Sequence, residues 1–239
     1  GGSRLTTMVN HFQPDILHSQ GLRADWISSR LMGSYKRVST QRNNPLEDYP
    51  PLVGRLKGNI AARLHYYALA GLPLVVACSQ TIANANTRRG LSSKVIRNGV
   101  DLTFAKPPLT QKDKMARRQA LGLPTSGRLF LYAGPLIPRK NPELLVRAFT
   151  GPMKQQESLV ILGDGRLLSD CRHLTKNAPN ISLPGSVDCV ADYHQVADLF
   201  VSASRAEGLP NAVLEALAAG LPALLSDIEP HREILTLSP

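Results

Sequence analysis

The chain has 239 residues, of which 43% are hydrophobic, and a net charge of +10, so it can bury the core of one large or two modest globular domains. No apolar run reaches the roughly 18 residues of a membrane-spanning helix. The first residues lack a secretory signal pattern, and the three cysteines form neither a disulfide framework nor a metal spacing, which favours a soluble cytoplasmic protein.

The positive charge is concentrated in the first half of the chain. Residues 1–120 hold 18 Lys and Arg against 6 Asp and Glu, whereas residues 121–239 hold 10 against 12. This asymmetry favours an anionic partner for the first half, such as phospholipid headgroups, a phosphorylated acceptor or nucleic acid. A merely soluble basic surface is the alternative. Nucleic acid ranks last, because only 5% of the residues are aromatic and no nucleic-acid-binding motif occurs.

Strand and helix patterns alternate along the first half. Strands are predicted at Pro14–His18, Arg37–Thr40, Leu74–Cys78 and Lys94–Ile96. Helices are predicted at Gly21–Leu31, at Leu56–Ala70 and after Ser79, which can cap the helix that it precedes. The Asn- and Pro-rich segment Gln41–Pro51 is predicted to be a loop. The alternation predicts an α/β fold with a parallel, doubly wound sheet.

The alternation restarts after a proline-rich, charged stretch, which we interpret as a linker with a peripheral helix. Strands are predicted at Leu129–Ala133, Ser158–Leu162, Ile181–Leu183, Asp198–Val201 and Leu221–Leu225. Helices are predicted at Pro142–Phe149, Arg166–Thr175 and Asp192–Ala197, from Pro210 to before Gly220, and from Pro230 onward. The predicted domains are therefore 1–105 and 125–239, with the linker and peripheral helix at 106–124.

Two carboxylates eight residues apart stand out after the fourth strand of the second half. Glu207 is expected on the loop between strand and helix, and Glu215 within the helix. Pro210 suits the first turn of that helix, and Gly220 suits the position just past its end. A helix N-terminus between two acids is a ready anion site. The alternative is a solvated loop glutamate and a glutamate on a polar helix face.

In a doubly wound sheet, ligands bind outside the carboxyl ends of the strands. One such loop begins at Gly134 and delivers two adjacent cations, Arg139 and Lys140, which could hold a pyrophosphate. The next loop contains Gly163 and Gly165, a tight turn that lets the backbone approach a ligand closely. Two exposed cations on an ordinary loop are the alternative.

His18 ends the first strand at the same kind of position in the first half. A structural role is the alternative for this lone histidine. The other five histidines have no metal spacing among them, and no hydrolase or zinc-peptidase motif occurs. Negative charge on a leaving group would then be stabilised by cations and a helix N-terminus.

Together these features resemble the family 4 glycosyltransferases, which are retaining enzymes of the GT-B fold. The family signature E-x7-E matches residues 207–215, and weaker matches occur at Pro14–His18, Val95–Asp101, Gly134–Lys140 and Leu162–Gly165. The resemblance implies two Rossmann-like, doubly wound parallel sheets facing a cleft. The family's first strands and terminal helices have no counterpart, so both domains are expected to be incomplete and the chain to be a fragment.

The resemblance implies contacts with the donor sugar. Glu207 would lie near the reacting centre, and His18 would contact the sugar from the opposite domain. The backbone amides of Gly208 and Leu209 would contact sugar or phosphate. Glu207 and His18 are thus the candidate catalytic residues.

The resemblance also assigns donor-binding residues. Lys140 would neutralise the diphosphate, Glu215 would bind the ribose hydroxyls, and the glycines at 134, 163 and 165 would shape the donor loops. The family often has Arg directly after the first of these glycines, where this chain has Pro135. One cation is thus missing unless Arg139 supplies it.

The implied activity is retaining transfer of a hexose-type sugar from a UDP- or GDP-sugar to a glycan or polyprenyl-linked acceptor. Cell-surface polysaccharide synthesis is the expected context, without metal or cofactor, in the cytoplasm or peripherally at an anionic inner membrane face. A nucleotide-sugar epimerase of the same fold is the first alternative, and a basic nucleic-acid-binding module is the second.

Overall fold

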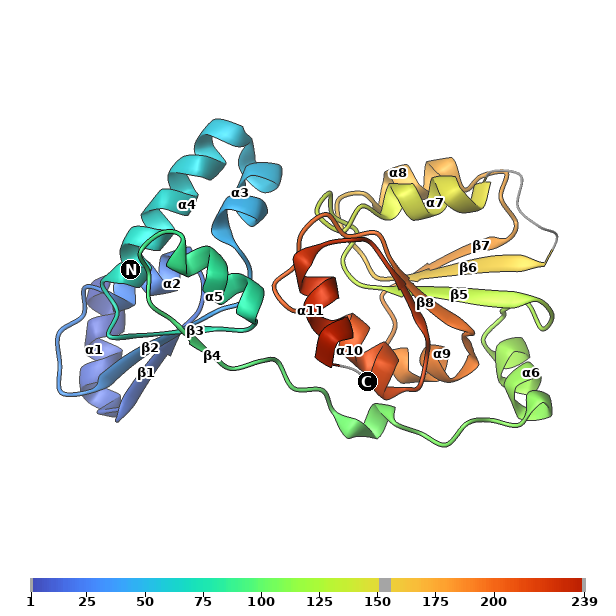
Figure 1. Ribbon diagram of the computed structural model, residues 1–239, viewed down its shortest axis with the longest axis horizontal. Helices are drawn as coiled ribbons and strands as arrows, with labels where there is room; N and C mark the ends of the chain where they lie inside the picture. The colour runs from blue at the N-terminus through green and yellow to red at the C-terminus, as the bar shows by residue number, and fades with distance from the viewer. Residues whose placement is uncertain (1, 151–155, 238–239) are drawn as a thin grey trace. The chain divides into compact units, whose positions relative to one another are not determined.

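The computed structural model describes residues 2–150 and 156–237 and divides into two compact units (Figure 1). The first unit comprises the chain up to Asn98, together with Glu207–Leu209 and the segment from Arg232. The second comprises Gly99–Ala206 and Pro210–His231. Each unit contains one parallel sheet with helices, which confirms the predicted α/β class.

The sheet of the first unit has four parallel strands in the order β1-β2-β3-β4. These are β1 (Ile16–Ser19), β2 (Lys36–Gln41), β3 (Leu74–Ala77) and β4 (Lys94–Val95). Val75 and Val76 of β3 are buried, as expected for a central parallel strand whose two faces are covered. All four predicted strands are confirmed, with ends shifted by at most two residues.

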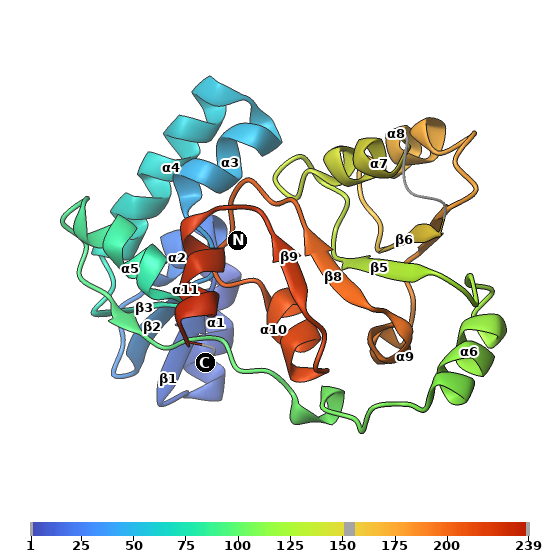
Figure 2. The same ribbon diagram turned by 45° about the vertical axis from the view of Figure 1, so that its right-hand side comes forward.

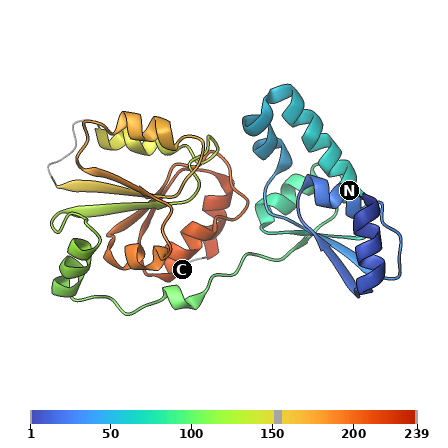
Figure 3. The ribbon, with the colours of Figure 1, turned by 180° about the vertical axis from the view of Figure 1, so that it is seen from behind.

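The described part of the first unit contains the helices α1 (Gly2–Phe12), α2 (Leu22–Ser28), α3 (Pro45–Val53), α4 (Arg55–Ala70) and α5 (Gln80–Thr87). The Oγ atom of Ser79 accepts a hydrogen bond from the Ile82 amide at 3.1 Å, so the predicted cap of α5 is confirmed. Figure 3 shows α3 and α4 lying side by side as a hairpin. A single residue, Gly54, joins them.

The prediction of a loop at Gln41–Pro51 was wrong, because most of this segment belongs to α3. Asn44 caps the helix through a hydrogen bond from the Leu46 amide, and Pro45 occupies the first turn, where its missing N–H costs nothing. A Cβ atom on Gly58 of α4 would collide with the backbone of Pro50. This close packing onto α4 stabilises a helix that its two late prolines disfavour.

The segment that leads into the second sheet contains a short 3₁₀ turn (Leu102–Phe104) and α6 (Gln111–Ala120). One carboxylate, that of Asp198, joins α6 to the sheet. Its oxygens accept hydrogen bonds from Lys114 Nζ at 2.6 Å, Arg118 Nη2 at 2.7 Å and the Leu129 amide at 2.7 Å. The helix predicted in this segment is therefore packed on the second unit.

The sheet of the second unit has five parallel strands in the order β7-β6-β5-β8-β9. These are β5 (Arg128–Ala133), β6 (Glu157–Leu162), β7 (Ile181–Gly185), β8 (Leu199–Ser202) and β9 (Ala223–Leu225). The helices that follow them are α7 (Pro142–Thr150), α8 (Leu168–Leu174), α9 (Val190–Val196), α10 (Asn211–Ala218) and α11 (Glu229–Leu237). All the strands and helices predicted for this half are confirmed.

The helices of the second unit lie on both faces of its sheet, which makes the sheet doubly wound. α7 and α8 cover one face and α9 and α10 the other (Figures 1 and 2). The core under α7 and α8 is built from buried apolar side chains, including Tyr132, Leu159 and Ile161. This arrangement places the loops after β5, β6 and β8 at one edge of the sheet.

Candidate functional site

The loops after β5 and β8 are bound to each other at the carboxyl edge of the second sheet. β5 and β8 are neighbouring strands, so their following loops emerge side by side. The Arg139 guanidinium donates from Nη1 to the carbonyl oxygen of Ala206 at 2.9 Å, and the Arg205 amide donates to the carbonyl oxygen of Arg139 at 2.8 Å. Arg139 thus has a structural contact that its sequence position did not indicate.

The glycines of the loop after β6 allow two backbone segments to touch. The Leu136 amide donates to the carbonyl oxygen of Asp164 at 2.8 Å. A Cβ on Gly163 would collide with the carbonyl oxygen of Gly134, and one on Gly165 would approach that of Leu136. The close approach that we expected toward a ligand is made here toward the protein's own backbone. A role of these glycines in donor binding stays a prediction.

Lys140 lies at the end of a compact turn that precedes α7. Its amide donates to the carbonyl oxygen of Ile137 at 3.0 Å, and the next residue, Asn141, has a φ of 53°. The turn starts at Gly134, whose φ of 152° favours glycine. The Lys140 side chain is partly exposed at this loop. The turn therefore places Lys140 just before a helix, and its role as a phosphate-binding cation stays a prediction.

Glu215 lies in α10 with its side chain partly buried. Burial raises the pKa of this carboxyl above its ordinary value. Gly220, with a φ of 76°, follows the end of α10 as predicted, whereas Pro210 is the N-cap residue and not, as expected, in the first turn. A half-buried carboxylate in a helix behind a loop fits an acceptor of hydroxyl hydrogen bonds.

Glu207, Gly208 and Leu209 pack with the first unit. Only 5% of the Glu207 surface is exposed, so the alternative of a solvated loop glutamate is excluded. A Cβ on Gly208 would collide with the carbonyl oxygen of Arg42, and the Asn98 side-chain amide donates to the carbonyl oxygen of Leu209 at 2.9 Å. Gly208 is therefore required by close packing as well as by any contact with a ligand.

His18 lies on β1 in the first unit and is exposed. Its Nε2 is 2.8 Å from the hydroxyl of Thr40, which lies near the end of the neighbouring strand β2. The imidazole is thus available at the carboxyl edge of the first sheet, where a ligand is expected.

Sequence reasoning missed a buried relay in the first unit, since His65 was noted only as lacking a metal spacing, and Asp25 and Tyr49 were not singled out. The Oδ2 atom of Asp25 is 2.8 Å from Nε2 of His65, and the Tyr49 hydroxyl is 2.8 Å from Nδ1 of His65. Ser19 Oγ donates to the other Asp25 oxygen at 2.6 Å. Burial tends to raise the pKa of Asp25, but the hydrogen bonds from His65 and Ser19 outweigh it and lower the pKa.

The relay ends in a cavity of about 210 Å³. Besides His65 and Tyr49, the cavity is lined mainly by polar side chains at and after the ends of β1 and β2, among them Gln20, Gln41, Arg42 and Asn43. Burial raises the pKa of Tyr49, so its hydroxyl stays protonated at neutral pH. Inspection of the residues directly after β2 would have pointed to this site, but the segment was interpreted as a plain loop.

Two classes of feature are not found among the described residues. No group of three or more His, Cys, Asp or Glu side chains in residues 2–150 and 156–237 is placed to hold a metal ion. Within the same ranges, no helix combines the length and apolar character needed to cross a bilayer.

Family models match both parts of the chain. Residues 2–104 match the model described as Glycosyltransferase Family 4. Residues 127–237 match the model described as Glycosyl transferases group 1. The first match covers the weaker sequence matches at Pro14–His18 and Val95–Asp101, and the second covers the E-x7-E signature at residues 207–215.

Curated relatives include bacterial enzymes of cell-surface glycan synthesis. An Escherichia coli UDP-Gal:alpha-D-GlcNAc-diphosphoundecaprenol alpha-1,3-galactosyltransferase is 32% identical over 56% of this chain and 36% of its own length. The putative teichuronic acid biosynthesis glycosyltransferase TuaC of Bacillus subtilis is 31% identical over 67% of this chain and 40% of its own length. The chain thus spans well under half the length of these two relatives.

A similar fold occurs in a solved structure, the Anabaena protein HepE in complex with UDP and glucose. It superposes with a TM-score of 0.82 at 16% identity, over 98% of this chain and 64% of that one. A likeness at this identity concerns the fold, and it confirms the predicted GT-B class.

Proposed function

The chain belongs to family 4 of the glycosyltransferases, and from this premise we propose that it carries the donor- and acceptor-side residues of a retaining enzyme. The enzyme would move a hexose-type sugar from a UDP- or GDP-sugar to a glycan or polyprenyl-linked acceptor in cell-surface polysaccharide synthesis. The observation that carries the proposal is the loop set of the second unit. There the turn ending at Lys140 and the helix bearing Glu215 follow neighbouring strands of one sheet.

The donor-side chemistry follows from these two residues. Lys140 is a point charge that would neutralise the diphosphate as it leaves. Glu215 would accept hydrogen bonds from the two ribose hydroxyls, and its partial burial strengthens such bonds. Arg139 is the second candidate cation, although one of its nitrogens already donates to Ala206.

The transfer itself would use Glu207 and His18 beside the donor sugar. The bond between the anomeric carbon and the diphosphate oxygen breaks, and a bond to the acceptor oxygen forms on the same face. The acceptor's proton passes to the leaving diphosphate. No metal takes part in this proposal, since cations and amide groups meet the developing charge.

The acceptor side is supported by the cavity in the first unit. With the His65 tautomer that donates from Nε2 to Asp25, Nδ1 accepts a hydrogen bond from the Tyr49 hydroxyl, whose oxygen also has a backbone hydrogen bond with Leu22. The lining combines amide and hydroxyl groups with one guanidinium and one carboxylate, Asp48, a mixture that suits the many hydroxyls of a sugar acceptor.

A thermal-shift panel with UDP-, GDP- and ADP-sugars tests the donor site. We expect a UDP- or GDP-sugar to raise the melting temperature of the chain. In Glu215→Ala, the affinity calculated from that rise should be at least tenfold weaker, a loss of about 1.4 kcal/mol in binding free energy. The matched control is Glu229→Ala, an exposed glutamate in the first turn of α11. Equal ligand shifts in wild type and Glu215→Ala would refute the ribose assignment.

Nucleotide release separates transfer from the leading alternative. A transferase releases free UDP or GDP in step with an added acceptor, whereas an epimerase of the same fold acts on the donor without one. Release that ignores the acceptor would favour the epimerase. The third candidate, a nucleic-acid-binding module, predicts retarded duplex mobility at moderate salt, which we do not expect.

A further inference from the structure

Helix α4 in the first unit carries two apolar faces, and only one of them is packed. Gly58, Ala62, His65 and Leu69 recur at helical spacing and are buried. A second set, Leu56, Ile60, Leu64 and Tyr67, recurs at spacings of four, four and three residues. These four side chains are 77%, 50%, 43% and 69% exposed. Apolar side chains that are singly exposed are ordinary, but four on one helical stripe mark an interaction surface.

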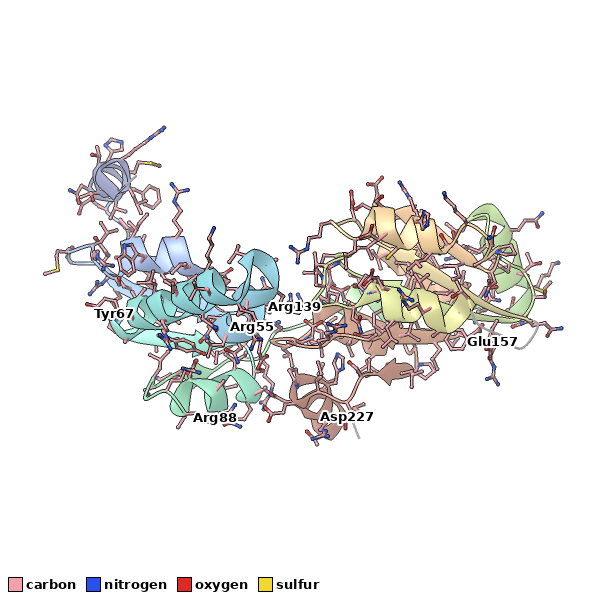
Figure 4. The ribbon with its side chains drawn as sticks, turned by 90° about the horizontal axis from the view of Figure 1, so that it is seen from above. Arg55, Tyr67, Arg88, Arg139, Glu157 and Asp227 are labelled. Carbon is pink, nitrogen blue, oxygen red and sulfur yellow. The ribbon has the colours of Figure 1, made fainter. Side chains whose placement is uncertain are left out.

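Two further exposed apolar side chains, Leu52 at 43% and Val53 at 55%, end α3 at the tip of the hairpin. We call the exposed side chains of Leu52, Val53, Leu56, Ile60, Leu64 and Tyr67 the α4 face. Figure 4 looks down on this helix, with Arg55 and Tyr67 labelled near its two ends. At 1.5 Å per residue the 16 residues of α4 extend over about 24 Å.

The charged side chains that α4 itself contributes are all cations. Arg55, Lys57 and Arg63 are exposed, and α4 contains no acidic residue. With 3.6 residues per turn, Arg63 falls within the stripe next to Leu56 and Tyr67, and Lys57 falls on its margin next to Leu64. Arg55, the first residue of α4, falls closer to the buried side of the helix. Among the described residues none of the three forms a salt bridge. The face is therefore apolar in the middle, and the charge that α4 adds beside it is positive.

An aromatic and a further cation adjoin one end of the face. The ring of Trp26, from α2, lies 6.2 Å from that of Tyr67 between centroids. The Arg30 guanidinium lies 3.5 Å above the Trp26 ring. Tryptophan and tyrosine next to basic side chains are typical of the boundary between lipid headgroups and acyl chains.

We propose that the α4 face docks on an anionic phospholipid surface, with the helix lying in the plane of the headgroups. Its apolar side chains would enter the acyl boundary, and the three cations would meet anionic headgroups. A second copy of the chain is a poorer occupant, since each face would bring three unpaired positive charges against three more. Docking needs neither donor nor acceptor, so it is independent of the transfer reaction.

Vesicle flotation tests the proposal with the chain as it stands. We expect binding to vesicles of phosphatidylcholine with phosphatidylglycerol, weak binding to phosphatidylcholine alone, and loss of the difference at high salt. Trp26 is the only tryptophan, so its emission should shift to the blue and be quenched by brominated acyl chains. No labelling is needed for this readout.

Two sets of variants locate the surface. The double variant Leu56→Glu/Ile60→Glu should lower vesicle affinity at least about tenfold, and Arg55→Gln/Lys57→Gln/Arg63→Gln should lower it roughly a hundredfold. The matched control is Leu102→Glu/Leu235→Glu, which charges two leucines that are similarly exposed at 74% and 53%. Thermal unfolding of each variant shows that it is folded.

Several results would overturn the proposal. Absence of flotation with anionic vesicles is one, and equal flotation of wild type and both α4 variants is another. Light scattering could instead reveal a dimer that Leu56→Glu/Ile60→Glu dissociates, in which case the face pairs two copies. If the chain binds anionic vesicles but does not turn over a nucleotide-sugar, the docking proposal is supported and only the proposed function is contradicted.

Discussion

Gly163 was expected to shape a ligand-binding loop, and in the structure it allows close packing of two backbone segments. Its φ of 130° lies in the region that side chains rarely adopt, and a Cβ there would collide with the carbonyl oxygen of Gly134. We expect Gly163→Ala to lower the free energy of unfolding by roughly 2–3 kcal/mol. Urea denaturation followed by circular dichroism measures the change.

Gly122 provides the matched control for that substitution. It too has a positive φ, 67°, but nothing lies within 4 Å of the position that a Cβ would take. Gly122→Ala should therefore cost only the backbone preference, about 1 kcal/mol. Equal losses for the two variants would show that the contact with Gly134 is unimportant.

At the scale of elements, the attachment of α6 depends on Asp198. Burial tends to raise the pKa of this carboxyl, but hydrogen bonds from Lys114, the Leu129 amide and Arg118 outweigh it and lower the pKa. Asp198→Asn removes the charge and leaves the buried Arg118 without its carboxylate partner. We expect a loss of roughly 2–3 kcal/mol in the free energy of unfolding.

Hydrogen exchange identifies where that loss occurs. Amides of α6 should exchange faster in Asp198→Asn than in wild type, because Lys114 and Arg118 of this helix both bond the Asp198 carboxylate. Asp188→Asn, an exposed aspartate, should change stability by less than about 0.5 kcal/mol. Unchanged protection of α6 in Asp198→Asn would contradict the assigned role.

Helix α3 shows where element prediction failed. Asparagine and proline are common in loops, but they are also common at the first residues of a helix. The local sequence therefore does not distinguish a loop from a helix start. Only the packing of α3 against Gly58 of α4 distinguishes the two outcomes, and that contact depends on residues eight positions beyond Pro50. The helical hairpin then places the α4 face on the surface.

At the scale of the whole molecule, three carboxylates make stability sensitive to acid. The pKa values of Asp25, Asp198 and Glu233 are all lowered, because their hydrogen bonds outweigh the effect of burial. A lowered pKa contributes stability that is present above the unfolded value, near 4, and is lost as the pH falls through the folded value. Glu215 opposes this trend, since burial raises its pKa and protonation relieves the cost.

We therefore expect the melting temperature to stay nearly constant between about pH 7 and pH 5 and to fall below about pH 4. Asp25 and Glu233 belong to the first unit and Asp198 to the second, so both units should lose stability. Differential scanning calorimetry across this range measures the effect. A melting temperature that does not fall in acid would contradict the hydrogen-bond assignments.

The sequence by itself determined the order of the strands and of most helices, and it indicated the family. Period-two and period-3.6 patterns are local properties, and so are the glycine turns and the E-x7-E spacing, so Gly134, Lys140, Gly163, Glu207 and Glu215 could all be singled out from neighbours in the chain. Their loops could also be assigned to the carboxyl ends of strands, because parallel sheets place them there.

Only the tertiary structure decided how several of these residues are used. Burial of Glu207 and the contact of Gly163 with Gly134 depend on segments distant in sequence. The relay of Asp25, His65 and Tyr49 joins residues up to 40 positions apart. The physical reason is that hydrogen bonds and close packing depend on distance in space, whereas a sequence pattern records only distance along the chain.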